Sequence, residues 1–274
     1  MKYTAQSSKY ILKNFLYLFP LAVLPAFFLA LSTDKTSIDC VVETIHSGAL
    51  QEMHFHHVFR AISVLNFASW PAIVWGLVGM LAMVICVAMM MALIEKHFRI
   101  GKRTFNGLFS KLNDYLPSTL WYGTLLLVIY ELWALITSVL IFFMSRITIL
   151  SLAYALMVIV FLAMHVVLIY LIGLLYLWLP CMQITGFRAI EALHYSYQLM
   201  APVKWQILVG QIAFLLFVEA LVGVLAAVIG SVAFTVLTTL LYAILIMVYC
   251  VRMQIAYFDR DNIERADLRN YYGR

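Results

Sequence analysis

Residues 205–251 read WQILVGQIAFLLFVEALVGVLAAVIGSVAFTVLTTLLYAILIMVYCV, and Glu219 is the one formally charged side chain among them. A helix that crosses the hydrocarbon core of a bilayer needs roughly 20 mainly apolar residues. The stretch is long enough for two such helices, and Gly230 and Ser231 mark a point where the chain can reverse. It predicts an all-α membrane protein whose helices pair as hairpins.

The apolar character extends over the whole chain of 274 residues. Hydrophobic residues make up 65% of it and charged residues 11%, against roughly a quarter charged in an ordinary soluble domain. This composition excludes a water-soluble globular enzyme, a disordered chain and a coiled coil. We predict a single transmembrane domain over residues 1–274, with six spans at about 14–32, 69–94, 118–143, 148–179, 205–229 and 232–252.

The remaining segments differ in length and charge. They are an outer segment at 33–60, inner linkers at 95–117 and 180–204, and an inner tail at 257–274. The basic N-terminus with its apolar continuation fits either a cleaved signal peptide or a retained first helix. The length of that apolar stretch, with Pro20 and Pro25 inside it, favours the retained helix.

Lysine and arginine fall mainly on one side of this topology. With six crossings and the N-terminus inside, 15 of the 18 basic residues lie in inner segments, and only Lys35, Arg60 and Arg146 lie outside. Inner loops of membrane proteins carry the excess of basic residues. We therefore expect a multi-pass protein of the bacterial cytoplasmic (inner) membrane with both termini in the cytoplasm. The net charge of +5 follows this topology, so nucleic acid is not an expected partner.

The two inner linkers repeat each other at an offset of 85 residues. The matched pairs are Gly101 with Gly186, Arg103 with Arg188, Phe105 with Ile190, Leu108 with Leu193, Leu112 with Tyr197, and Pro117 with Pro202. The apolar positions have helical spacing. We predict three units, each an interfacial amphipathic helix followed by a hairpin of two spans, with the segment around Ile11 and Phe15 as a degraded third copy.

The two interfacial helices have two interpretations. Such a helix can lie in the headgroup plane and orient the next span, or it can dock a cytoplasmic partner as a coupling helix. Residues 102–116 have one apolar and one polar face, which fits both interpretations. The bilayer is the expected partner in the first, and a membrane or cytoplasmic protein in the second.

Three segments carry a resemblance to a known family. They read GKRTFNGLFSKLNDYLP at 101–117, GFRAIEALHYSYQLMAP at 186–202 and VRMQIAYFDRDNIERADL at 251–268. In layout and degenerate pattern the chain resembles a largely uncharacterised bacterial six-span membrane protein family, similar to the membrane domain fused to some glycerophosphodiester phosphodiesterases. The resemblance implies a fold and a membrane location, and it carries over no catalytic signature.

Two acidic residues stand near the centres of predicted spans, Glu131 in the third and Glu219 in the fifth. After the offset of 85 they fall three positions apart, and His165 lies near the centre of the fourth span. Ionisable groups at this depth are costly and are functional candidates by default. One interpretation is a buried cluster that binds a cation or passes protons. The other is that each glutamate is protonated, or bonded to a neighbouring hydroxyl, and serves helix packing.

The outer segment holds His54, His56 and His57, a set that can ligate zinc or copper. No acidic or cysteine ligand stands at a matching spacing, so a solvated amphipathic loop helix is the preferred interpretation and no metal or cofactor is predicted. The chain also lacks Walker A, HExxH, GxSxG and GxGxxG motifs, which argues against an enzyme.

Two functional hypotheses remain. The first is a transporter or export-related permease component, in which Glu131 and Glu219 line a polar pathway; an ABC-type permease is one version of it. The second is a structural or accessory membrane protein that docks a partner through the two interfacial helices. The sequence alone identifies neither a substrate nor an oligomeric state.

Overall fold

The computed structural model describes residues 2–269, and every regular element within them is a helix. Six helices are long and apolar enough to cross a membrane. They are α1 (Lys2–Ser32), α4 (Trp70–Ile100), α5 (Leu108–Ser145), α6 (Leu150–Leu174), α9 (Lys204–Val228) and α10 (Ser231–Arg260). The predicted all-α fold with six membrane-spanning helices is confirmed.

Shorter helices fill the connections. Between α1 and α4 lie α2 (Lys35–Ser47), the 3-10 helix η1 (Leu50–Glu52) and α3 (Phe55–Ile62). Between α6 and α9 lie α7 (Trp178–Pro180), the π-helix η2 (Cys181–Thr185) and α8 (Ala189–Met200), and α11 (Ala266–Arg269) follows α10. The α6 helix and its continuation through η2 make one apolar stretch that ends at Thr185.

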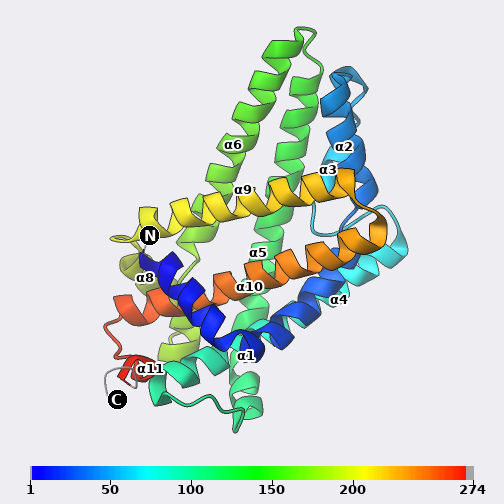
Figure 1. Ribbon diagram of the computed structural model, residues 1–274. Helices are drawn as coiled ribbons and strands as arrows, with labels where there is room; N and C mark the ends of the chain where they lie inside the picture. Colours follow the sequence, from blue (N-terminus) through cyan, green and yellow to red (C-terminus); the bar gives the residue numbers. More distant parts are fainter. Residues whose placement is uncertain (1, 270–274) are drawn as a thin grey trace.

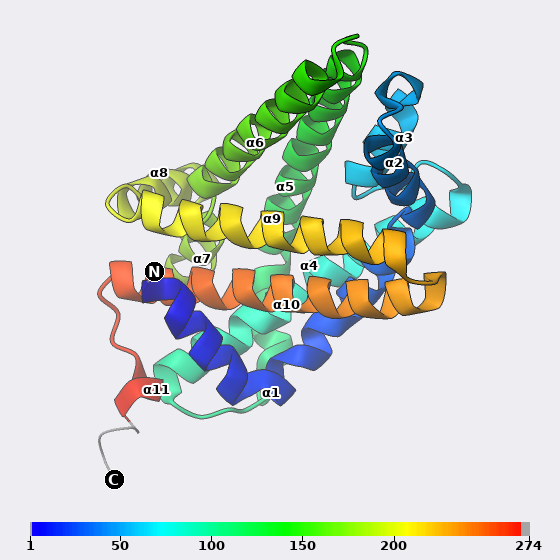
Figure 2. The same cartoon turned by 45° about the horizontal axis from the view of Figure 1, so that its top comes forward.

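The long helices cross one another at steep angles (Figure 1). α1 packs along both α4 and α10, and these two contacts are the most extensive in the molecule. α5 and α6 form an antiparallel pair that extends beyond the other spans, with α2 and α3 beside it (Figures 1 and 2). We call the end of the bundle that holds Lys2 and Arg260 the terminal end, and the end that holds α2, α3 and the α5–α6 turn the far end.

The third predicted hairpin is open. α9 and α10 are joined by a short turn and run side by side in opposite directions (Figure 2), yet they touch at few positions. Their far-end halves share an apolar cluster that includes Val222, Ala226 and Phe234. α10 packs mainly along α1, and a cavity lies between α9 and the rest of the bundle.

The spans extend farther toward the terminal end than the sequence predicts. α1 begins at Lys2, α4 continues to Ile100, α5 begins at Leu108 and α10 continues to Arg260. The extensions are helical because they pack on one another: Tyr10, for example, places its ring against Phe98 at 5.2 Å. The inner linkers of the structure are therefore shorter than the predicted 95–117 and 180–204.

The N-terminal unit of the predicted repeat contains a break between its first helical segment and its span. Asn14 leaves helical geometry, with φ −119° and ψ 17°, inside α1. Its side-chain amide donates to the carbonyl of Tyr10 at 2.7 Å and so occupies an acceptor of the preceding turn. A side chain that competes for backbone groups in this way bends a helix.

The interfacial helix predicted at 102–116 is not a separate element, and this prediction is wrong. A loop follows Gly101, and α5 then runs without interruption from Leu108 through Pro117. The first turns of α5 are held to the end of α4, because Lys111 and Tyr115 both donate to the Glu95 carboxylate.

The second copy does form its own helix, α8. The positions offset by 85 from Lys111 and Tyr115 are Ser196 and Met200, which make no equivalent bond, and α8 ends at Met200. Gly101 and Gly186 share one feature of the repeat, since both adopt left-handed backbone with φ of 74° and 72°. The repeat as a whole stays a prediction.

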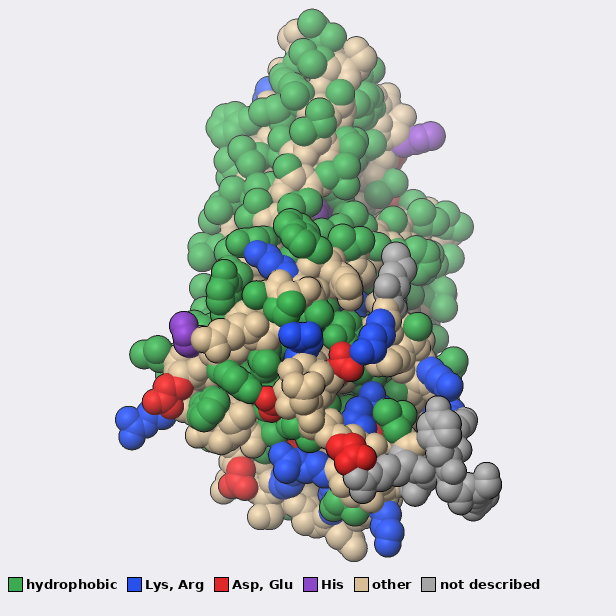
Figure 3. Space-filling model, turned by 90° about the vertical axis from the view of Figure 1, so that its left-hand side faces the viewer, with side chains coloured by type: hydrophobic (Ala, Val, Ile, Leu, Met, Phe, Trp, Pro, Cys, Tyr) green, Lys and Arg blue, Asp and Glu red, His purple; other side chains and the backbone are tan. Residues whose placement is uncertain are grey.

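The outer surface divides by polarity. On the face drawn in Figure 3, Lys, Arg, Asp and Glu side chains gather on the lower part, whereas the side chains of the upper part are mostly hydrophobic. Large apolar side chains such as Leu16, Trp121 and Val232 are more than 70% exposed. A surface of this kind is stable in contact with lipid rather than water.

Candidate functional site

A cavity of about 570 Å³ lies inside the bundle, in the space left by the open α9–α10 hairpin. All six long helices contribute to its wall, together with α2 and the end of α3. Most of the lining side chains are apolar. The polar exceptions include Tyr130, Gln211, Glu219, Tyr242 and Arg252. A concave, mainly apolar space with a few polar groups is the usual form of a small-molecule site.

A polar pair joins α6 to α9, and Glu219 is its member that lines the cavity. Nε2 of His165 lies 2.7 Å from Oε2 of Glu219, and Nδ1 of His165 lies 2.8 Å from the carbonyl oxygen of Phe161. A carbonyl oxygen only accepts, so Nδ1 must carry a hydrogen. One further proton then lies between Nε2 and Oε2, and the pair is neutral overall whichever atom holds it. The His165 side chain is 1% exposed and that of Glu219 is 27% exposed.

Aromatic rings hold the imidazole of His165 in place. The Trp133 ring meets it edge to face at 4.8 Å, and the Phe161 ring lies 4.2 Å away. Trp133 is itself fixed, because its indole N–H donates to the carbonyl of Met164 at 2.6 Å. With its ring fixed in this way, His165 presents Nε2 to Glu219 on α9.

Glu131 does not join this pair. Its carboxylate accepts from the Ser63 hydroxyl at 2.7 Å and from the backbone N–H groups of Val64 and Leu65 at 3.0 Å each. It thereby satisfies the loop after α3, where the backbone has left the helix. No hydrogen bond or ion pair links Glu131 to Glu219 within residues 2–269. Of the two interpretations that the sequence leaves open, bonding to a neighbouring hydroxyl describes Glu131, and it is Glu219 that pairs with His165.

Two buried polar side chains on the cavity wall are not predicted from the sequence. Arg252 is 2% exposed and Gln211 is 6% exposed. The positive-inside count places Arg252 in the inner segment because the sixth span is predicted to end there. The structure places it eight residues before the end of α10 at Arg260. Gln211 carries no charge, so a search for charges within the spans passes over it.

The residues predicted to form docking faces differ in exposure between the two copies of the repeat. Leu108 is buried in the main core, Leu112 packs against it, and the Phe105 ring lies 4.8 Å from that of Tyr17. In α8, by contrast, the equivalent apolar side chains are exposed: Ile190 by 84%, Leu193 by 37% and Tyr197 by 54%. Arg103 and Arg188 are exposed as well. All three of these positions are exposed in α8, whereas in the first copy Phe105, at 58%, is exposed and Leu108 and Leu112 are packed on the core.

The three histidines of the outer segment lie together at the start of α3. The rings of His56 and His57 are 4.1 Å apart, and the ring of His54 stacks on that of His56 at 5.5 Å. No group of three His, Cys, Asp or Glu side chains in the described part of the chain is placed to hold a metal ion. His57 instead lies 3.4 Å from the Ser37 hydroxyl of α2.

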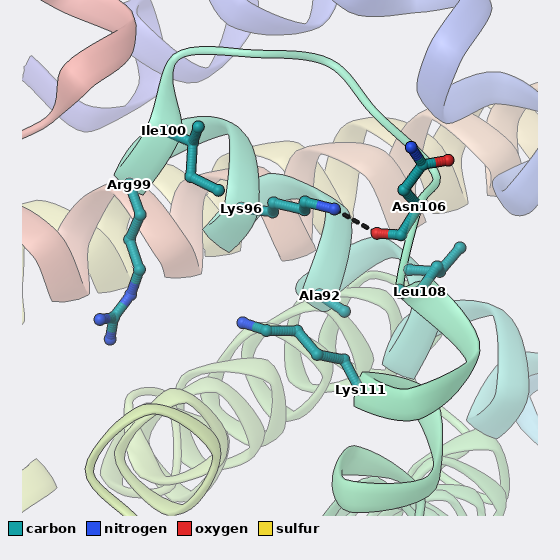
Figure 4. Close-up of a pocket in the computed structure, with 8 residues that line it drawn as sticks. Ala92, Lys96, Arg99, Ile100, Asn106, Leu108 and Lys111 are labelled. Atoms are coloured by element: carbon teal, nitrogen blue, oxygen red, sulfur yellow. Dashed lines mark hydrogen bonds between the residues drawn. The ribbon is translucent and has the colours of Figure 1, made fainter.

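A second, smaller pocket of about 180 Å³ opens at the α4–α5 loop. Lys96 and Lys111 point toward the same space from the two helices, and Lys96 donates to the carbonyl of Asn106 (Figure 4). Glu95, which is 3% exposed, pairs with Lys111 at 2.5 Å and with Arg99 at 2.7 Å. Because this carboxylate forms ion pairs with two of the three cations, we interpret the pocket as part of the contact between α4 and α5.

Comparison of the chain with protein-family models, with curated proteins and with solved structures finds no match. The resemblance to the six-span family therefore stays a prediction. The functional proposal rests on the cavity and on the polar side chains that line it.

Proposed function

We propose that the chain is a transport-class membrane protein, a transporter or export-related permease component, which takes a mainly apolar molecule into the cavity beside α9. The observation that carries this proposal is the position of Glu219, which lines a cavity of about 570 Å³ and is hydrogen-bonded to the buried His165. Ionisable side chains inside a membrane bundle mark substrate pathways and proton relays. The volume falls within the roughly 300–1,000 Å³ of small-molecule sites.

The assignment of Glu131 narrows the proposal. Its three hydrogen bonds to the loop at 63–65 occupy the carboxylate in a structural role. Glu219 retains one oxygen beyond its bond to His165 and lines the cavity. The polar pathway is therefore proposed to use Glu219 and His165 and to leave Glu131 out.

Orientation belongs to the same proposal. The positive-inside count supports the terminal end as the cytoplasmic one, in a bacterial inner membrane. Lys35, Arg60 and Arg146, the three basic residues expected outside, belong to the far end of the bundle. Arg146 there donates to the carbonyls of Gln51 and Met53, so its charge serves to close the outer segment.

The test is a comparison of cells that lack the chain with cells that regain it. Mass spectrometry of lipids and small molecules in cells and medium measures what accumulates without the protein. Wild-type protein should restore the profile, and Glu219→Gln and His165→Leu variants present at equal level in the membrane should not. Glu43→Gln, an exposed carboxylate on α2, is the control. An unchanged profile in cells lacking the chain, or full restoration by Glu219→Gln, would remove the proposal.

A second function, docking of a partner, is favoured by the exposed apolar face of α8. Affinity capture in mild detergent should then recover a stoichiometric partner, and Ile190→Glu with Tyr197→Glu should release it. If an ATPase is encoded beside the chain, both proposals can hold at once, because an ABC-type permease transports a substrate and docks an ATPase. Capture of the wild-type protein without any stoichiometric partner would contradict the docking role.

A further inference from the structure

Arg252 is a buried cation without a counterion. Its side chain leaves α10 toward α9, and its Nε donates to the Tyr176 hydroxyl at 3.3 Å. Its Nη1 has no hydrogen-bond partner among the described residues, and no acidic side chain in that part of the chain forms an ion pair with it. A charge in this condition is among the most unfavourable features that a membrane interior can hold.

Gln211 lies on the facing helix at the same level. A Cβ placed on the neighbouring Gly210 would lie 3.2 Å from Nη1 of Arg252, so the guanidinium rests directly against α9 at this point. The Gln211 side chain is buried, and neither atom of its amide makes a hydrogen bond of normal geometry among the described residues, although the Tyr176 hydroxyl lies close enough to interact with it. Arg252 and Gln211 both line the cavity. Two helices thus bring unpartnered polar groups to the wall of one cavity.

The donors suit an oxyanion. A guanidinium presents its N–H groups in a planar fork that matches carboxylate or phosphate oxygens, and the bonds are strengthened by charge. The amide N–H₂ of Gln211 adds a further donor beside that fork. An anion seated there would accept from Nη1 of Arg252 and from the amide nitrogen of Gln211 together.

The rest of the cavity suits an apolar chain. From Gln211 the wall continues along α9 through Phe214, Leu215 and Val218 before it reaches Glu219. Glu219 lies eight residues beyond Gln211, or about 12 Å along the helix axis. A ligand with a negative head at Arg252 therefore has an apolar channel for its tail and keeps its charge away from the carboxyl group.

We propose that the cavity binds a single-chain amphiphile with an anionic head, which Arg252 and Gln211 hold at the terminal-end side while the acyl chain lies along α9. A volume of about 570 Å³ is that of a small-molecule site, which favours one acyl chain over the two of a bilayer phospholipid. The head is a carboxylate in a free fatty acid or a phosphate in a lysophospholipid. This inference rests on the proposed function, for which it names the class of ligand.

The test measures binding to the purified full-length chain in nanodiscs of phosphatidylcholine. The probe is cis-parinarate, a fluorescent fatty acid, which is displaced by palmitate or by palmityl alcohol of equal chain length. Lysophosphatidylglycerol and lysophosphatidylcholine make a second pair that differs in net head charge. The variants are Arg252→Gln, Arg252→Lys and Gln211→Leu. Arg260→Gln on the same helix is the matched control, because Arg260 lies outside the cavity and donates to the carbonyl of Leu199.

Wild-type protein should prefer the anionic member of at least one pair by tenfold or more, and the preferred pair identifies the head group. Arg252→Gln should abolish that preference, Arg252→Lys should retain part of it, and Arg260→Gln should leave it unchanged. Equal affinity of the wild type for both members of both pairs would overturn the proposal. Retention of the full preference by a folded Arg252→Gln variant would overturn it as well.

If Arg252→Gln does not fold, two other measurements decide whether the anionic head binds at this site: the preference of the wild type and the reduction of that preference in Gln211→Leu. If the anionic preference is absent but Glu219→Gln still fails to restore cells, the ligand is neutral and the proposed function stands. If the preference is present and Glu219→Gln restores cells fully, the site binds an amphiphile without the proposed transport role.

Discussion

His165 and Glu219 share one proton across 2.7 Å, and this bond connects α6 to α9 beside the cavity. The bond survives in either protonation form, because Nδ1 of His165 is committed to the carbonyl of Phe161. Neither helix places these groups together by itself, since they lie 54 residues apart in the chain. The pair is therefore a tertiary contact that holds α9 against α6 at this point.

The His165–Glu219 bond should appear as a coupling energy. We expect a double-mutant cycle with His165→Leu and Glu219→Leu to give about 0.5–2 kcal/mol, because hydrogen bonds between membrane helices average near the lower value. The measurement is the free energy of unfolding in mixed micelles. If the two single changes simply add, the groups do not interact in the folded protein.

Glu131 should behave as a structural residue. Glu131→Ala removes the acceptor of the Ser63 hydroxyl and of two backbone N–H groups, and we expect a loss of about 3 kcal/mol of stability. Hydrogen exchange at Val64 and Leu65 should accelerate. The matched change Glu43→Ala at an exposed position of α2 should leave exchange there unchanged. Unaltered protection of both amides in Glu131→Ala would show that the carboxylate does not hold this loop.

Gly79 should be needed for the contact of α4 with α1. A Cβ at this position would lie 3.1 Å from the backbone nitrogen of Leu29 and 3.0 Å from its Cδ2. We expect Gly79→Ala to destabilise the protein by about 1–3 kcal/mol, as over-packing of a close contact does. Gly223→Ala on α9 is the control, because its Cβ meets nothing within 4 Å. Equal melting temperatures for the two variants would refute a close-packing role for Gly79.

Tyr195 should ionise unusually late. Its hydroxyl donates to Asp261, and this bond, with burial and the nearby negative charge, raises the pKa of Tyr195 to about 12. The neutral phenol is therefore favoured in the folded protein. The stability it contributes is present below the ordinary tyrosine pKa of about 10 and is lost as the pH rises through about 12.

Absorbance titration measures this shift. The difference between wild type and Tyr195→Phe should show one tyrosine that titrates near pH 12. The same difference taken in an Asp261→Asn background should move toward the ordinary value. A wild-type difference curve already centred near pH 10 would contradict the role of Asp261.

Several features of the fold follow from sequence pattern alone. Uncharged runs of bilayer length predict the six spans, and Gly230 and Ser231 predict the turn between α9 and α10, because each signal is local. The helix ends at the terminal end escape prediction. Charged residues there continue each helix by packing on other spans, as Glu95 does when it binds Lys111 of α5. Spacing along one chain segment does not contain that information.

The candidate site shows the same division. Glu219 and His165 are identifiable as costly charges within spans, but their pairing, and the diversion of Glu131 to the loop after α3, depend on how the helices cross. The sequence ends the sixth span at Arg252, and only the tertiary packing shows that α10 continues to Arg260 and that the Arg252 side chain is buried. Sequence determined a helical membrane protein and the short list of ionisable groups inside it, since hydrophobicity and charge are properties of single residues. Tertiary structure alone decided which of those groups meet and where the cavity lies, since both result from how helices distant in sequence pack against one another.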